Sequence, residues 1–229
     1  LRRKPELGPP RRGHRRRLGR IPHTSPARLS MPPSSSLVPG IFAKTFQRPT
    51  LGGILDAVVQ HGLQCVQFNF ACCGLPTVPR EVPEAVLRDA QHALQQRRIE
   101  VAAVSATFNL IHPDPVQRAE GLSRLPGLAR AARALGSSML TVCTGTRDAA
   151  DMWRAHPDNA SPDAWSDLCR SMEQALQSTE DSGIVFGIEP ELSNVVSSAA
   201  RCRQLLDTLR SPRLRVVLDG ANLLTPSDL

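Results

Sequence analysis

The feature that most constrains the fold is a repeated pattern: a short apolar run, a loop, then a longer stretch with helical spacing. Six apolar runs predict strands at 38–43, 64–70, 99–106, 138–143, 184–188 and 214–218. The stretches between them predict helices at 51–61, 83–98, 115–135, from 161 onward and at 197–210. Strands that alternate with helices predict a parallel sheet, because the chain must cross over to start each new strand.

A barrel and an open nucleotide-binding sheet are the two architectures that this alternation allows. The strands read as continuously apolar, which is typical of a parallel sheet covered on both faces. A nucleotide-binding sheet needs a Gly-rich phosphate loop after its first strand, but residues 44–49 contain no Gly. Polar residues instead collect where the strands end, at Asn69, Asn109, His112, Thr144, Glu189, Glu191, Asp219 and Asn222. A (β/α)₈ TIM barrel concentrates its chemistry at that end of its strands. We therefore expect a partial barrel over 37–229, with six βα units present and the last two missing.

The first 36 residues differ in composition from the rest. Residues 1–30 hold ten Lys or Arg and one Glu, a charge of +9, so the other 199 residues carry −2 of the total +7. We expect 1–36 to be a disordered basic head and Pro/Ser linker, because it lacks the hydrophobicity to fold. It could be a nucleic-acid or membrane-surface tail, a transit peptide, or an upstream stretch outside the functional protein. The last is favoured, since Met31 precedes the first strand.

Composition excludes several classes of protein. No apolar run approaches the roughly 20 residues that a membrane helix needs, so we expect no membrane partner. Aromatic residues make up only 3% of the chain and Tyr is absent, which disfavours a nucleic-acid partner. The six cysteines form no C-x-x-C pair, and no secretory segment is visible, which predicts free thiols and a cytoplasmic location. The oligomeric state stays open, a homo-oligomer included.

Glu189 and Asp219 are the strongest candidates for chemistry, because they end adjacent predicted strands and should face one cavity. Two carboxylates there could hold a hard divalent cation, which would polarise a sugar oxygen. Alternatively, one carboxylate could abstract a proton next to a carbonyl. Helix capping or ion pairing is the purely structural explanation, and spacing alone supports it equally.

Two histidines and a tryptophan lie in loops after predicted strands. His112 could bind a metal, contact a substrate oxygen or act as an acid or base, although a lone loop His is more often simply solvated. His156 has the same alternatives, and the nearby Trp153 could form a lid or a sugar-stacking face over the barrel mouth. A loop anchor packed on the barrel is an equally good interpretation of Trp153.

The stretch 37–229 resembles the sugar phosphate isomerase/epimerase family, the xylose isomerase-like TIM barrels. The blocks that carry the resemblance are 107–114 (TFNLIHPD), 143–148 (CTGTRD), 152–153, 156–159, 187–191 (GIEPE), 194–196, 216–219 (VVLD) and 221–223. The Glu-Pro-Glu and Leu-Asp-x-x-Asn blocks in this order are moderately specific together, and each alone is weak.

The resemblance implies a divalent metal held by Glu, Asp, His and Glu at the ends of strands five to eight. Glu189 and Asp219 match the first two ligands, Glu191 is a weaker stand-in for Glu189, and the other two ligands would lie beyond Leu229. The implied metal is Mn²⁺, Mg²⁺ or Co²⁺, with Zn²⁺ as an alternative. Many relatives carry His where this chain has Asn222, which weakens inference about substrate contacts there.

The resemblance also implies a reaction: proton transfer beside the carbonyl of a sugar or sugar phosphate, through an enediolate. Glu189 and His112 would be catalytic. The residues expected to bind substrate are Asn69, Asn109, Trp153, His156 and Asn222. A metal-dependent isomerase or epimerase is therefore the first hypothesis. A non-catalytic remnant or binding protein comes second, since an open barrel exposes two sheet edges. An endonuclease-like phosphodiesterase of the same fold comes third, because three zinc ions need many His and only four lie after residue 36.

Overall fold

The computed structural model describes residues 37–223, and within them six strands form one sheet. The strands are β1 (Gly40–Phe42), β2 (Cys65–Phe68), β3 (Glu100–Ser105), β4 (Met139–Cys143), β5 (Val185–Glu189) and β6 (Leu214–Val216). The carboxyl end of each strand lies within two residues of the predicted end. The predicted basic head, 1–36, lies outside the described residues.

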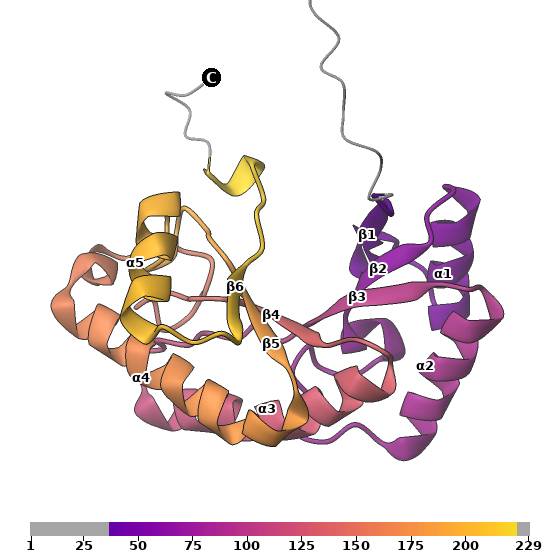
Figure 1. Cartoon of the computed structure of the whole chain (residues 1–229), viewed down its shortest axis with the longest axis horizontal. Coiled ribbons are helices and arrows are strands. Elements are labelled where there is room, and N and C mark those ends of the chain that lie inside the picture. Colours follow the sequence, from indigo (N-terminus) through magenta and orange to yellow (C-terminus); the bar gives the residue numbers. More distant parts are fainter. Residues whose placement is uncertain (1–36, 224–229) are drawn as a thin grey trace, which may run out of the picture. The chain divides into compact units, whose positions relative to one another are not determined.

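All neighbouring strands pair in parallel, in the order β1-β2-β3-β4-β5-β6. This is the order in which a barrel is wound, with each strand beside the next one in sequence. In Figure 1 the sheet is curved, its helices lie along the outer side, and β1 and β6 flank the open side. The predicted α/β class with a parallel sheet is confirmed. The described residues contain six of the eight strands of a TIM barrel.

Five α-helices connect the strands, and polar N-caps define where most of them begin. They are α1 (Leu51–Gln60), α2 (Glu84–Gln96), α3 (Pro115–Ala134), α4 (Pro162–Ser178) and α5 (Ala199–Leu209). The side chains of Thr50, Asp114, Ser161 and Ser198 accept hydrogen bonds from the first turns of α1, α3, α4 and α5. These caps satisfy backbone donors that have no partner within the helix. The predicted helix starts agree with the structure within two residues.

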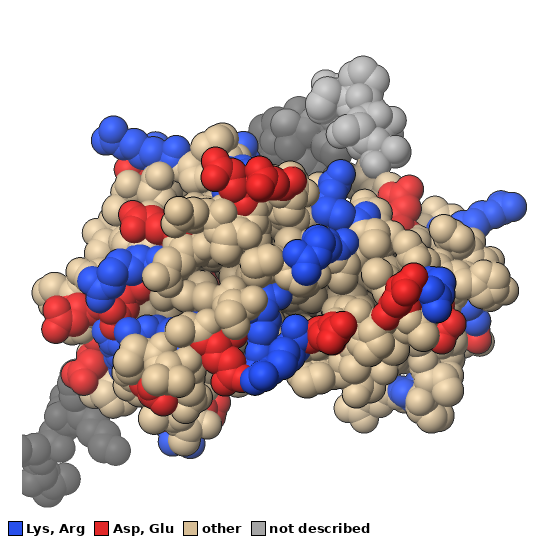
Figure 2. Space-filling view, turned by 90° about the horizontal axis from the view of Figure 1, so that it is seen from below, with Lys and Arg blue, Asp and Glu red and all other residues tan. Residues whose placement is uncertain are grey.

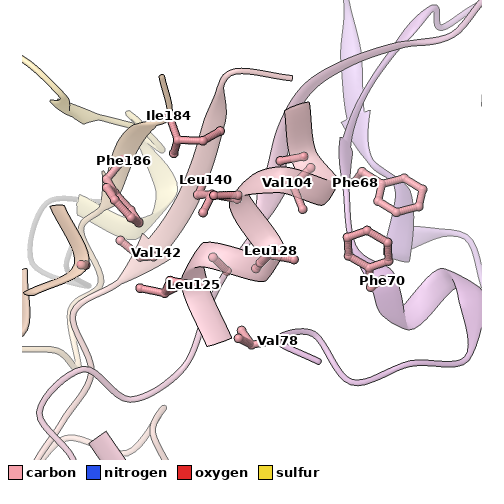
Figure 3. Close-up of a cluster of buried hydrophobic side chains, with 14 of the residues drawn as sticks. Phe68, Phe70, Val78, Val104, Leu125, Leu128, Leu140, Val142, Ile184 and Phe186 are labelled. Carbon is pink, nitrogen blue, oxygen red and sulfur yellow. The ribbon is translucent and has the colours of Figure 1, made fainter. Parts of the chain in front are cut away.

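The strands present different chemistry to their two sides. Alternate residues such as Val66, Phe68 and Val104 are fully buried in the apolar core against the helices. Figure 3 shows part of this core, with side chains from β2 to β5 packed around Leu125 and Leu128 of α3.

The inner side of the sheet is partly polar. Gln67 and Ser105 line a cavity there, and Gln67 Nε2 donates to Thr141 Oγ1 at 3.0 Å. The description of the strands as continuously apolar is therefore wrong for the inner positions of β2 to β4. A hydrophobic run in the sequence conceals this alternation, because small polar residues such as Ser and Thr interrupt it only briefly.

One ion-pair cluster ties α3, α4 and the loop after β4 together. Asp167 on α4 accepts from Arg147 at 2.6 Å, lies 3.5 Å from Arg118 of α3, and also pairs with Arg170. Burial alone would raise the pKa of Asp167, but these three guanidiniums outweigh it and lower the pKa. Figure 2 shows that acidic and basic side chains are interspersed on the side of the molecule where α3 and α4 lie in Figure 1.

No helix within 37–223 is long and apolar enough to cross a membrane. All six cysteines are free thiols, as predicted.

We predict that Asp167→Asn destabilises the fold by about 2 kcal/mol near pH 7, because it leaves partly buried guanidiniums without their carboxylate. The lowered pKa means that this stabilisation is present above the ordinary value of 3.8 and is lost as the pH falls through the folded-state pKa. Urea denaturation of both proteins between pH 2.5 and 7 measures the difference. Equal stability at pH 7 would contradict the assigned role, and Asp163→Asn, on the first turn of the same helix, is the control.

Candidate active site

A cavity of about 690 Å³ lies at the carboxyl ends of the strands. Every strand contributes to its wall, either directly or through the residues that follow it. The lining residues are Phe42, Lys44, Gln67, Asn69, Thr77, Ser105, Thr107, Cys143, Met152, Trp153, Glu189, Glu191, Val217, Leu218, Asp219 and Gly220. We call this space the strand-end cavity. Because residues in or just after all six strands meet in its wall, it is the natural place for chemistry in this fold.

Three carboxylates form one wall of the strand-end cavity. Glu189 is the last residue of β5, and Asp219 follows β6. Glu191 lies beyond the strand, as the sequence predicted, yet its side chain still faces the cavity. Its backbone is fixed there, since Glu191 N donates to Val196 O at 3.1 Å. The predicted pairing of Glu189 with Asp219 at one cavity is therefore what the structure shows, and Glu191 joins it.

Asn222 connects two of these carboxylates. Its Nδ2 donates to Glu191 Oε1 at 2.9 Å and to Glu189 Oε1 at 3.3 Å. Asn222 lies in the 3₁₀ turn η5 (Ala221–Leu223). Asp219 precedes this turn, and its Oδ1 accepts a hydrogen bond from Ala221 N at 2.9 Å. A neutral amide orients the two glutamates without neutralising their charge.

The environment of the glutamates favours their neutral forms. Burial raises the pKa of Glu189, and the nearby Asp219 carboxylate raises it further. Burial also raises the pKa of Glu191, as do Glu189 and Asp219, while the hydrogen bond from Asn222 acts in the opposite direction. Buried carboxylates with raised pKa values are typical of sites that bind a cation or move a proton.

Cys143 lies beside the glutamates, since it pairs with Glu189 in the register of β4 and β5. Burial, together with Glu189 and Glu191, raises the pKa of its thiol to about 12. The thiol is therefore neutral at ordinary pH and is a poor nucleophile.

Two further residues predicted to bind substrate line the strand-end cavity. Asn69 follows β2 and is only 2% exposed, and its Oδ1 caps the turn η2 (Phe70–Cys73) by accepting from Ala71 N. Trp153 is 51% exposed and projects from the long loop after β4. An exposed indole at a cavity wall is suited to pack against the apolar face of a sugar ring.

Asn109 and His112 do not line the strand-end cavity; they line a separate pocket of about 320 Å³ beside α3. Asn109 joins two loops: Oδ1 accepts from Thr146 N at 3.1 Å, and Nδ2 donates to Thr146 O at 2.8 Å. His112 is 8% exposed, its Nδ1 accepts from Asp114 N, and its Nε2 lies 3.1 Å from Ala149 O. Backbone groups therefore occupy the polar atoms of both side chains.

His156 also lies outside the strand-end cavity. Its Nδ1 accepts from Asp158 N at 3.2 Å and so caps the turn η3 (Pro157–Ala160). The side chain lines a separate groove of about 400 Å³ that also contains Asn194 and Arg201.

The sequence prediction missed Lys44, Gln67, Thr107 and Cys143 as cavity residues. Lys44 directly follows the predicted first strand, so the strand-end rule that identified Asn69 could have found it. Gln67 interrupts an apolar run, which is a signal for an inward position. Nothing in the local sequence distinguishes Cys143 from an ordinary core residue.

The carboxylate wall fits the chemistry of a divalent cation. Mg²⁺ and Mn²⁺ prefer carboxylate oxygens and are often held by one or two of them, with water and substrate completing the coordination. Glu189 and Asp219 would supply two such oxygens. Among residues 37–223, however, no group of three or more His, Cys, Asp and Glu is placed to hold a metal ion. The described residues thus offer a partial ligand set of the right type.

The sequence matches the xylose isomerase-like TIM barrel family over residues 55–228. The chain therefore belongs to the xylose isomerase-like TIM barrel family, as its motifs predicted. No curated protein matches the sequence.

Solved structures share the fold at low identity. A xylose isomerase domain protein from Alicyclobacillus acidocaldarius is 21% identical, with 78% of this chain and 62% of that one covered and a TM-score of 0.57. The 3-keto-D-glucoside 4-epimerase YcjR from E. coli, in its apo form, is 12% identical, with 77% and 66% covered and a TM-score of 0.59. A xylose isomerase-like TIM barrel protein from Mycobacterium smegmatis, in complex with magnesium, is 10% identical, with 81% and 65% covered and a TM-score of 0.61.

These matches give the length of the chain relative to other proteins of this fold. The chain spans 62% to 66% of the three solved proteins.

We predict that the metal-free protein loses stability as the pH rises above about 4.5, the ordinary pKa of the two glutamates. Their folded-state pKa values are raised, so the fold is favoured while they are protonated and loses that stability as each one ionises. The double variant Glu189→Gln/Glu191→Gln mimics the neutral state and should gain stability relative to the native chain over this window. Thermal melts in EDTA between pH 4 and 7.5 measure the difference in stability between the two proteins. Parallel pH profiles for the two proteins would contradict the prediction.

Proposed function

We propose that the chain carries the carboxylate half of the active site of a metal-dependent sugar isomerase or epimerase. The observation that supports this most strongly is the wall formed by Glu189, Glu191 and Asp219 in the strand-end cavity. It lies at the end of the strands where TIM-barrel enzymes bind substrate. The solved epimerase of the same fold acts on a keto sugar, as its name states, and the Mycobacterium smegmatis protein was solved with magnesium.

In this proposal Glu189 and Asp219 would hold the divalent cation, which when bound would polarise a substrate carbonyl oxygen and stabilise negative charge on it. Glu189 or the adjacent Glu191 accepts a proton from the carbon next to the carbonyl. The C–H bond breaks and its electron pair enters an enediolate. Protonation of the same carbon on its opposite face gives the epimer, whereas protonation of the neighbouring carbon, with a hydroxyl proton moved from that carbon's oxygen to the former carbonyl oxygen, gives the isomer. The hydrogen bonds from Asn222 keep both glutamates turned toward the cavity.

The opposite side of the strand-end cavity provides groups that could bind sugar hydroxyls. Asn69 and Thr107 reach it from the ends of β2 and β3, and Trp153 offers a ring face. The proposal assigns no substrate contact to Asn109 or His112, because loop backbone occupies their polar atoms. It assigns none to His156, because that side chain lines a separate groove.

The geometry disfavours a zinc phosphodiesterase. The cavity lining contains no His, and the four histidines between 37 and 223 lie elsewhere: His61 and His92 on helices or their ends, and His112 and His156 in loops. A trinuclear zinc site that depends on His would therefore find no His ligand among the described residues of this cavity.

We predict that Glu189→Gln weakens Mn²⁺ binding at least about tenfold, because it removes one charged ligand from a site with few. Titration of the 229-residue chain with Mn²⁺, followed by electron paramagnetic resonance, measures this. The matched control is Glu100→Gln, an exposed glutamate at the amino-terminal end of β3, far along the strand from the cavity. Equal Mn²⁺ affinity in native and Glu189→Gln proteins would remove Glu189 from the metal site.

The reaction is tested separately by proton exchange. With Mn²⁺ and a panel of neutral and acidic ketoses in D₂O (D-fructose, D-ribulose, D-fructose 6-phosphate and 5-keto-D-gluconate), the native protein should exchange the hydrogen next to the carbonyl of at least one, observed by ¹H NMR, and Glu189→Gln should not. Absence of exchange in the native protein, with Mn²⁺ bound, would contradict the proposed activity while leaving the metal site intact.

A further inference from the structure

The strand-end cavity is electrically polarised. Its β5–β6 wall carries Glu189, Glu191 and Asp219, whereas its β1–β2 wall carries Lys44 and Asn69. These strands lie at opposite ends of the sheet order, so the two kinds of group face the cavity from different sides. Figure 1 shows β1 and β2 on one flank of the open sheet and β6 on the other.

Lys44 is the single cationic side chain in the lining of the strand-end cavity. It lies in η1 (Ala43–Thr45), the 3₁₀ turn that directly follows β1 and packs beside β2 and η2. None of the ion pairs formed within residues 37–223 involves Lys44. Its charge is therefore available to a bound molecule, in contrast to Arg147 or Arg118, whose guanidiniums pair with Asp167.

Asn69 supplies a second donor on the same wall. The residue is 98% buried, and its Oδ1 is used by Ala71 N, which orients the amide and turns Nδ2 away from that turn. Within the described part of the chain, Nδ2 has no hydrogen-bond partner, although Asn69 lines the cavity. Arg124 Nε is the only side-chain nitrogen or oxygen of the described residues that is both buried and unpaired, so Asn69 Nδ2 is accessible and can donate to water or a ligand in the cavity.

We propose that Lys44 and Asn69 bind an anionic oxygen group of the substrate, a carboxylate or a phosphate, so that the substrate is an acidic sugar derivative. This rests on the proposed function, because it concerns the same cavity. An ammonium and an amide N–H are the donors that such an anion requires. The carboxylate wall repels the same anion, so the substrate is bound in one orientation. Its acidic end lies against β1 and β2, and its carbonyl end lies against the three carboxylates.

The sequence allows Lys44 to be observed directly. Lys4 and Lys44 are the only lysines in the chain, so reductive methylation with ¹³C-formaldehyde labels two side chains and the terminal amine while keeping their charge. The full 229-residue chain, labelled and kept in EDTA, is titrated with D-gluconate, D-glucitol 6-phosphate and the neutral D-glucitol. The Lys44 signal, identified by its absence in Lys44→Met, reports binding at this wall.

We expect the Lys44 signal to shift and saturate with at least one of the two anions and not with D-glucitol. Saturation by gluconate alone identifies the group as a carboxylate, and saturation by the phosphate alone identifies it as a phosphate. Equal effects of D-glucitol and the anions, or no saturable shift with any of the three, would overturn the proposal.

Variants test the two donors separately by calorimetry with the anion that binds. Lys44→Met should lower the affinity for this anion about tenfold or more, as expected for loss of a charge-assisted hydrogen bond. Asn69→Asp keeps an oxygen to cap η2 but replaces the amide donor by a negative charge. It should therefore weaken binding of the anion and leave the response to D-glucitol unchanged. The control is Arg48→Met, which removes the same charge from an exposed residue outside the lining.

Native affinity in Lys44→Met would overturn the proposal, and melting temperatures establish that each variant is folded. These measurements use no metal and no turnover. If Lys44→Met loses anion binding but the native chain does not bind Mn²⁺, the proposed metal site alone is refuted. If the native chain binds Mn²⁺ but Lys44→Met binds the anion with native affinity, the anion site alone is refuted.

Discussion

The alternation of side chains along the parallel strands is the constraint on which the rest of the structure depends. Outward residues such as Phe68 and Phe186 are buried completely under the helices, and this core holds the sheet in its curve. A one-residue slip of any strand would exchange its two faces, so burial of the outer set fixes the register. The same register directs the inward residues toward the inner side of the sheet, where they are not needed for the apolar core against the helices. Glu189 can end β5 as a partly buried carboxylate because Ile188, its neighbour, packs outward.

Most of the architecture could be predicted from the sequence, because it follows from periodicity and capping. The helical pattern from residue 161 onward predicted α4, and the apolar run before Glu189 predicted β5. The pairing of Glu189 with Asp219 at one cavity followed from the same logic, since adjacent parallel strands end at the same edge. Strand-end residues are predictable because the strand itself fixes their direction.

The loop residues were harder to predict, because hydrogen bonds that are remote in sequence fix their directions. Asn109 bonds to Thr146, and Gly145, with φ of 79°, leaves room for it: a Cβ there would lie 2.1 Å from Asn109 Oδ1. His112 is held by Ala149, which belongs to the loop after a different strand. A local motif carries no information on such partners. A functional role inferred from residue type alone is therefore least secure where loops pack on one another.

The chemistry of the carboxylate wall depends on what the chain places beside it. The sequence has 28 Lys and Arg, yet the strand-end cavity includes one of them, Lys44, from the far end of the sheet order. Beside the glutamates the chain places Asn222, a neutral donor that orients two carboxylates and leaves their charge in place. An arginine there would neutralise that charge and weaken the electrostatic attraction for a cation. The separation of Lys44 from the carboxylates keeps one wall of the cavity negative and the other positive, which is the arrangement that the proposed metal site and the proposed anion site both require.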